Sequence, residues 1–142
     1  MAALPDYIVN RLVELATDLK DASLGDDPVL AEECYEELKD YCFDLINEGK
    51  ECALVWETLG DFTRDGDSAL EYYAQALAVA DRDGEPTHSI LIAIGERHSD
   101  SGRLDLARDF LGRGLHGATV AGDQDMLVRA DILLAELGPA AE

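Results

Sequence analysis

The sequence predicts an all-α protein. Apolar residues recur with a period near 3.6 along most of the chain, which is typical of amphipathic helices. Strand-like alternation of apolar and polar residues is scarce, and only 4 of the 142 residues are proline. Gly, Asp and Pro instead interrupt the apolar stretches at places where helices are expected to begin and end. We therefore expect helices joined by short loops in a single domain over residues 1–142.

The first two helices are predicted over residues 5–22 and 28–47. Each carries an apolar face with the spacing of a helix that packs on a neighbour. In the first helix this face consists of Ile8, Leu12, Leu15, Ala16 and Leu19. In the second helix it consists of Leu30, Ala31, Cys34, Tyr35, Leu38, Cys42 and Leu45. Together the two helices are expected to form a hairpin over residues 5–47.

Five further helices are predicted over residues 51–64, 67–81, 86–101, 104–121 and 124–137. The first four of these pair into hairpins over residues 51–81 and 86–121. Pro86 stands where the second hairpin begins, and proline is favoured in a first helical turn. The last helix is expected to cap the domain.

The second, fourth and sixth helices repeat one another at an offset of 38 residues, a sign of a helical-hairpin array. This offset aligns Ala31 with Ala69 and Ala107, Tyr35 with Tyr73 and Leu111, Leu38 with Ala76 and Gly114, and Cys42 with Ala80 and Ala118. The third and fifth helices match at 35 residues, with Trp56 on Leu91, Leu59 on Ile94, and Gly60 on Gly95. Small residues at recurrent positions predict that neighbouring helices approach closely there.

These residues resemble the tetratricopeptide repeat family, whose motif combines a large residue, Leu-Gly, a turn Gly and then Ala, an aromatic residue and Ala. Residues 88–121 follow its spacing with Leu91, Ile94, Gly95, His98, Gly102, Ala107, Leu111 and Gly114. Residues 53–81 carry Trp56, Leu59, Gly60, Ala69, Tyr73 and Ala76, with a Gly60-to-Ala69 interval three residues shorter than the pattern. The pair over residues 5–47 matches only in its second helix. The resemblance implies a right-handed α-solenoid of about three antiparallel hairpins plus a C-terminal capping helix.

Members of this family are typically non-catalytic scaffolds that hold peptides or proteins in a concave groove, lined by the exposed face of each first helix. Carried over to this chain, the resemblance predicts partner contact at Leu54, Glu57, Asp61, Asp65, Ile92, Glu96 and Asp100. A plain solvated face is the alternative for each of them. Some family members clamp a peptide carboxylate with Lys, Asn and Arg at such positions. Acidic residues largely replace them here, so we expect no carboxylate clamp and a preference for Lys and Arg instead.

Charge is the strongest feature of the composition. Eleven Lys and Arg stand against 31 Asp and Glu, for a net charge of −20. Residues 1–50 hold 4 basic and 13 acidic side chains, and residues 51–142 hold 7 and 18, so the charge belongs to the whole body. Direct nucleic-acid binding is not expected, because phosphate contacts need Lys and Arg. The charge indicates a basic protein partner, with solubility alone as the alternative.

No catalytic residue, metal ligand or cofactor is predicted. The three histidines form no HExxH pattern, and His98 is expected to pack at a seam between helices. The segment GRGLHG over residues 112–117 matches a dinucleotide-binding loop by letter, but it lies inside a predicted helix with no strand before it. Its glycines are expected to allow close helix packing.

The remaining candidate ligands have structural explanations. Cys34, Cys42 and Cys52 are eight and ten residues apart, unlike the cysteine pairs of zinc sites, and are expected to be buried reduced thiols. The acidic pairs at residues 65/67 and 123/125 are interpreted as helix starts.

Two functions fit these expectations. The first is an acidic immunity or inhibitor protein that neutralises a basic toxin or effector. The second is a tetratricopeptide-type adaptor or secretion chaperone that holds a partner segment in its groove. A cytoplasmic location is expected, because no apolar run reaches about 18 residues and the first residues lack the basic start and apolar block of a signal peptide.

Overall fold

The computed structural model describes residues 4–139, and every regular element in this range is a helix. The elements are α1 (Asp6–Leu24), α2 (Pro28–Asn47), α3 (Ala53–Phe62), α4 (Gly66–Asp83), α5 (His88–Asp100), α6 (Leu104–Ala121) and α7 (Gln124–Leu137). The predicted all-α class is therefore confirmed for the described residues, which form seven helices and no strand.

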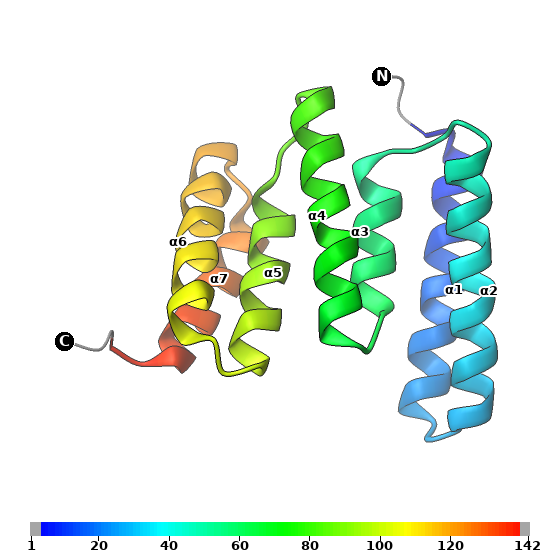
Figure 1. Ribbon diagram of the computed structural model, residues 1–142, viewed down its shortest axis with the longest axis horizontal. Coiled ribbons are helices and arrows are strands. Elements are labelled where there is room, and N and C mark those ends of the chain that lie inside the picture. The colour runs from blue at the N-terminus through cyan, green and yellow to red at the C-terminus, as the bar shows by residue number, and fades with distance from the viewer. Residues whose placement is uncertain (1–3, 140–142) are drawn as a thin grey trace.

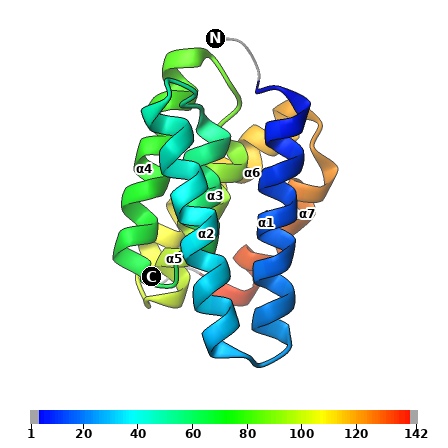
Figure 2. The same ribbon diagram turned by 90° about the vertical axis from the view of Figure 1, so that its right-hand side faces the viewer.

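Consecutive helices pair with one another. Figure 1 shows the antiparallel pairs α1/α2, α3/α4 and α5/α6 side by side in chain order, with α7 against α5 and α6. Packing within a pair is more extensive than packing between α2 and α3 or between α4 and α5. Figure 2 places α1 and α7 on one side of the molecule and α2 and α4 on the other.

Helix ends follow local chemistry. Asp65 accepts a hydrogen bond from the backbone N–H of Ser68 at 3.1 Å, and Asp123 accepts one from that of Met126 at 3.3 Å. Both side chains thus satisfy amide groups that a helix start leaves without partners, which confirms their interpretation as helix starts. Pro86 precedes the fifth helix, which begins two residues later at His88.

The core is built from the positions that the repeat aligns. Ala69, Ala76, Ala80, Ala107 and Ala118 all have an exposed fraction of 0%. Leu59, Tyr73, Leu91, Ile94 and Leu111 are also buried. Small side chains at these places let the helix axes approach, and the large ones fill the space between pairs.

Two large aromatic residues, Trp56 and Phe110, are only half-buried. Trp56 donates its indole N–H to Glu51 at 2.9 Å, which keeps one edge of the ring at the surface. Phe110 is covered on the outside by polar residues, because His98 stacks on it with 5.5 Å between ring centroids and Arg113 lies 5.1 Å from its centroid. The same stack confirms that His98 packs between helices.

Glycines mark the closest approaches between paired helices. A Cβ built on Gly60 would lie 2.5 Å from the ring of Tyr73, and one on Gly95 would lie 2.6 Å from Leu111. These are aligned positions of the repeat, so the same contact between a glycine and a large side chain occurs within the α3/α4 pair and within the α5/α6 pair. Gly114 and Gly117 are similarly close to α5, as the sequence predicted for the glycines of this segment, but that prediction is wrong for Gly112, where an added Cβ would meet nothing within 4 Å.

Candidate protein-binding groove

A groove of about 630 Å³ runs along the side of the molecule formed by α1, α3, α5 and α7. Its lining from α1 is Leu12, Val13, Ala16, Thr17 and Lys20, and its lining from α3 is Leu54, Thr58, Asp61 and Phe62. Tyr73 of α4, Ala93, Glu96, Arg97 and Asp100 of α5, and Arg129 of α7 complete it. Every first helix of a pair therefore contributes to one surface.

A smaller pocket of about 230 Å³ opens beside the groove between α3, α5 and α7. It shares Asp61, Ala93, Glu96 and Arg129 with the groove, and its other lining residues are Glu57, Ser89, Ile92 and Met126. We call this the side pocket. Three carboxylates and one guanidinium thus surround a partly apolar cavity.

The structure brings together most of the predicted partner-binding residues. Leu54, Asp61, Glu96 and Asp100 line the groove, and Glu57 lines the side pocket. Leu54 is 43% exposed, so the groove presents an apolar side chain to solvent.

The other two predicted residues do not project into the groove. Ile92 is only 3% exposed and belongs mainly to the core between α5, α6 and α7, so it is not the exposed groove residue that we expected. It meets α6 where Gly114 leaves room for it, and only its edge reaches the side pocket. Asp65 caps α4 and faces a different cleft, between the α1/α2 pair and the α3–α4 turn. The turn carries it off the groove face, because α3 ends at Phe62 rather than continuing to residue 64.

Glu57 has no Lys or Arg ion-pair partner among the described residues. Exclusion of water by its surroundings raises the pKa of its carboxyl, and the nearby Ser89 hydroxyl offsets only part of this effect. A carboxylate in such a place lacks both full hydration and a compensating cation.

Asp61 is held by a hydrogen bond that the Tyr73 hydroxyl donates at 2.7 Å. Part of the Asp61 side chain reaches solvent, but neighbouring groups exclude water from its carboxyl and so raise its pKa. The Tyr73 hydrogen bond and the Arg97 charge lower this pKa in part. Burial and the Asp61 carboxylate together raise the pKa of Tyr73, which keeps its hydroxyl protonated as the donor.

The groove also contains cations that the sequence-based prediction did not include. Lys20 lies over the ring of Phe62 at 5.7 Å from the centroid, and Arg129 pairs with Glu96. Arg97 donates to the backbone carbonyls of residues 60 and 63, at 3.0 and 2.7 Å. The groove is therefore mixed in charge rather than largely acidic. Lys20 could have been found by treating residues 5–22 as the first helix of a repeat.

The densest run of exposed carboxylates lies on α2, in the first helix pair. The exposed acidic residues of α2 are Glu32, Glu33, Glu36, Glu37, Asp40 and Asp44. Lys39 is the only basic residue of this helix. This acidic helix contributes no residue to the groove and lies on the other side of the molecule from α1 and α7 (Figure 2).

The histidines and cysteines have structural surroundings. His88 is buried and its Nε2 donates to the Asp123 carboxylate at 2.8 Å, which ties the start of α5 to the start of α7. All three cysteines are free, but the expected burial holds only for Cys42, where burial raises the pKa of the thiol to about 12. Cys34 and Cys52 are half-buried. Within residues 4–139 no group of His, Cys, Asp or Glu is arranged to hold a metal ion. None of the helices in this range is long and apolar enough to span a membrane.

Comparisons with known families, proteins and structures gave no match. No protein-family model matches the chain, and neither a curated protein nor a solved structure matches it.

Proposed function

We propose that this chain is a non-catalytic protein-binding module that holds a cationic segment of a partner protein in its groove. In this proposal it acts as an immunity or inhibitor protein of a basic toxin or effector. We also propose that the helix pairs of this chain form a right-handed solenoid of tetratricopeptide-like hairpins. The lining of the groove by α1, α3, α5 and α7 supports it, because first helices form the binding surface in that family.

The observation that carries the proposal is Glu57. Its carboxyl is partly shielded from water and has no Lys or Arg partner among residues 4–139, which costs free energy in the unbound protein. A Lys or Arg side chain from a partner would remove that cost by pairing with it. The side pocket suits such a side chain, since its aliphatic stem would lie against Ile92 and Met126 while its charged head meets Glu57 and Asp61.

The acidic first pair supports the same partner class. With 13 acidic and 4 basic side chains in residues 1–50, its field would draw a cationic protein toward the molecule. Long-range attraction of this kind raises the association rate more than it deepens the final affinity. The first pair would therefore steer the partner, and the side pocket would hold it.

A capture experiment with matched variants tests the proposal. The first variant combines Glu57→Gln with Asp61→Asn, because an amide oxygen still accepts the bond from Tyr73. The control combines Glu71→Gln with Asp109→Asn, which removes the same charge from exposed positions on α4 and α6. Each protein is immobilised and exposed to lysate of the source organism, and captured proteins are identified and then purified.

We expect a basic protein to bind wild type and the control but to be lost from the groove variant. Its association rate should fall as salt rises, since exposed charges are screened over about 8–10 Å at physiological salt. Equal capture by the two variants would contradict the groove assignment, and an acidic captured protein would contradict the partner class.

Apolar groove residues favour a second function. Val13 is 59% exposed and Leu54 is 43% exposed, so the groove offers contacts to an uncharged segment as well. An adaptor or secretion chaperone would use them. In that case Leu54→Ser would weaken capture, whereas the Glu57/Asp61 variant and added salt would leave it unchanged.

A further inference from the structure

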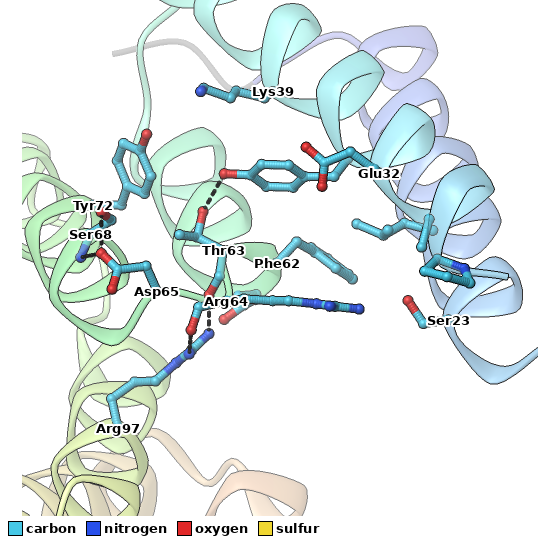
Figure 3. Close-up of a pocket in the computed structure, with 15 residues that line it drawn as sticks. Ser23, Glu32, Lys39, Phe62, Thr63, Arg64, Asp65, Ser68, Tyr72 and Arg97 are labelled. Carbon is cyan, nitrogen blue, oxygen red and sulfur yellow. Dashed lines mark hydrogen bonds between the residues drawn. The ribbon is translucent and has the colours of Figure 1, made fainter. Parts of the chain in front are cut away.

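A second cleft, of about 590 Å³, lies between the α1/α2 pair and the α3–α4 turn. Lys39 of α2 lies on one side, and Phe62 and Arg64 lie on the other (Figure 3). Tyr35 of α2 also lines the cleft. We call it the inter-pair cleft. Its volume is within the range of about 300–1,000 Å³ that is usual for small-molecule sites.

One hydrogen bond fixes the width of the cleft. The Thr63 hydroxyl donates to the carbonyl of Leu59 at 2.7 Å, so the Tyr35 hydroxyl is the donor in its 2.9 Å bond to Thr63. This bond joins α2 to the end of α3 across the cleft. Arg97 holds the same turn from α5 by donating to the Thr63 carbonyl, as Figure 3 shows. Both walls are therefore positioned before any ligand binds.

The cations of this protein that lack an acidic partner gather at this cleft. Among the described residues, which include all eleven Lys and Arg, six form ion pairs with Asp or Glu. The other five are Lys20, Lys39, Arg64, Arg97 and Arg103. Three of these five line the cleft, and Lys20 lies over the ring of the wall residue Phe62. In a chain with 31 acidic residues, this grouping of cations without carboxylate partners is unlike a surface designed only for solubility.

Two of the cations are available to a ligand. Arg64 extends from the α3–α4 turn toward Ser23 below Phe62, and Lys39 lies at the upper edge of the view in Figure 3. Neither side chain forms a hydrogen bond within the described residues, whereas Arg97 is already used by backbone carbonyls. The start of α4 also opens onto the cleft through Ser68, and helix starts carry partial positive charge.

The wall carboxylates are mostly engaged elsewhere. Asp65 accepts from both the backbone N–H and the hydroxyl of Ser68, and Asp61 accepts from Tyr73. Only Glu32 is exposed at the edge without such a bond. Its negative charge would repel an anion in the cleft, so removing that charge should strengthen anion binding.

We propose that the inter-pair cleft binds a small organic anion, in which a flat apolar body carries a sulfonate, carboxylate or phosphate. The body lies between Tyr35 and Phe62, and the anionic group meets Arg64 and Lys39. Guanidinium groups recognise such anions through paired N–H donors. The proposal goes beyond the proposed function and does not depend on it, because its two ligand-binding cations line neither the groove nor the side pocket.

The probes for the test are 8-anilinonaphthalene-1-sulfonate and the uncharged N-phenyl-1-naphthylamine, which share an aromatic body and differ in the sulfonate. Each is titrated into the full chain, and binding is followed by the fluorescence of the probe and by quenching of Trp56. This is the single tryptophan, and its ring lies 6.1 Å from that of the cleft residue Tyr72. We expect one site per chain and an affinity for the sulfonate about tenfold or more above that for the neutral probe.

Three variants decide the outcome. Lys39→Gln with Arg64→Gln should reduce sulfonate affinity about tenfold or more and leave the neutral probe unchanged, because charged hydrogen bonds are lost. Glu32→Gln should strengthen sulfonate binding. The control Arg103→Gln removes an exposed cation outside the cleft and should change neither. Equal affinity for the two probes, or the same loss in the control as in the double variant, would overturn the proposal.

Discussion

Gly114 and Gly112 provide a sharp test of the α5–α6 packing, because they lie two residues apart in one helix and differ in surroundings. A Cβ on Gly114 would lie 2.5 Å from Cγ1 of Ile92 and 3.2 Å from two backbone atoms of α5. A Cβ on Gly112 would meet nothing within 4 Å. Alanine at the two positions therefore changes helix propensity equally but changes packing only at Gly114.

The magnitude follows from two effects. Replacing glycine by alanine inside a helix stabilises it by about 1 kcal/mol. Carbon atoms pack best at about 3.5–4.0 Å, so the new methyl group at residue 114 must displace Ile92 by about 1 Å and push on the α5 backbone. Overpacking of this kind costs about 1–3 kcal/mol. We expect Gly112→Ala to stabilise the protein. The free energy of unfolding of Gly114→Ala should be about 1–3 kcal/mol lower than that of Gly112→Ala.

Urea unfolding measures this difference. Far-UV circular dichroism follows all helices, and Trp56 fluorescence follows the second pair, so coincident transitions would justify a two-state free energy. In a chain of this length, each kcal/mol should correspond to roughly 3 °C in the thermal midpoint. If Gly114→Ala were as stable as Gly112→Ala, the close approach of α5 and α6 would be refuted.

Two further predictions concern the core and the hydrogen bond between His88 and Asp123. Ala76 is fully buried, so Ala76→Leu should lower the free energy of unfolding by about 1–3 kcal/mol through overpacking. Ala74→Leu, on the exposed side of the same helix, should change this free energy by less than about 0.5 kcal/mol. Similar values for the two variants would show that the register of α4 is wrong. The hydrogen bond from His88 holds the pKa of the Asp123 carboxyl below its usual 3.8. The ionised carboxylate therefore contributes to the free energy of unfolding above pH 3.8, and this contribution is lost as the pH falls through the lower pKa of the folded state. Asp123→Asn should therefore be less stable than wild type at pH 6–7 and equal to it near pH 2, as measured by urea unfolding; a constant difference across this range would exclude the linkage.

The candidate site could be predicted in part. Leu54, Asp61 and Glu96 were placed on one surface because the tetratricopeptide resemblance assigns the groove to the exposed faces of the first helices, and all three do line the groove. The cations Lys20 and Arg129 were missed, since they come from α1 and α7, whose place beside the groove depends on how successive pairs stack. Periodicity defines which face of a helix is polar, but it does not say which distant helix that face meets.

The sequence by itself determined the helices and their packing positions. Pro, Gly and Asp act within a few residues of the backbone they terminate, and the aligned small residues report how closely a helix can be approached. Tertiary structure alone decided the burial of Ile92 and the existence of the inter-pair cleft. Helix α5 contacts α4, α6 and α7, so its buried arc is wider than one amphipathic stripe and includes Ile90, Leu91 and Ile92 in succession. The cleft joins α2 to a turn some 30 residues further along the chain, and nothing local to either segment specifies that meeting.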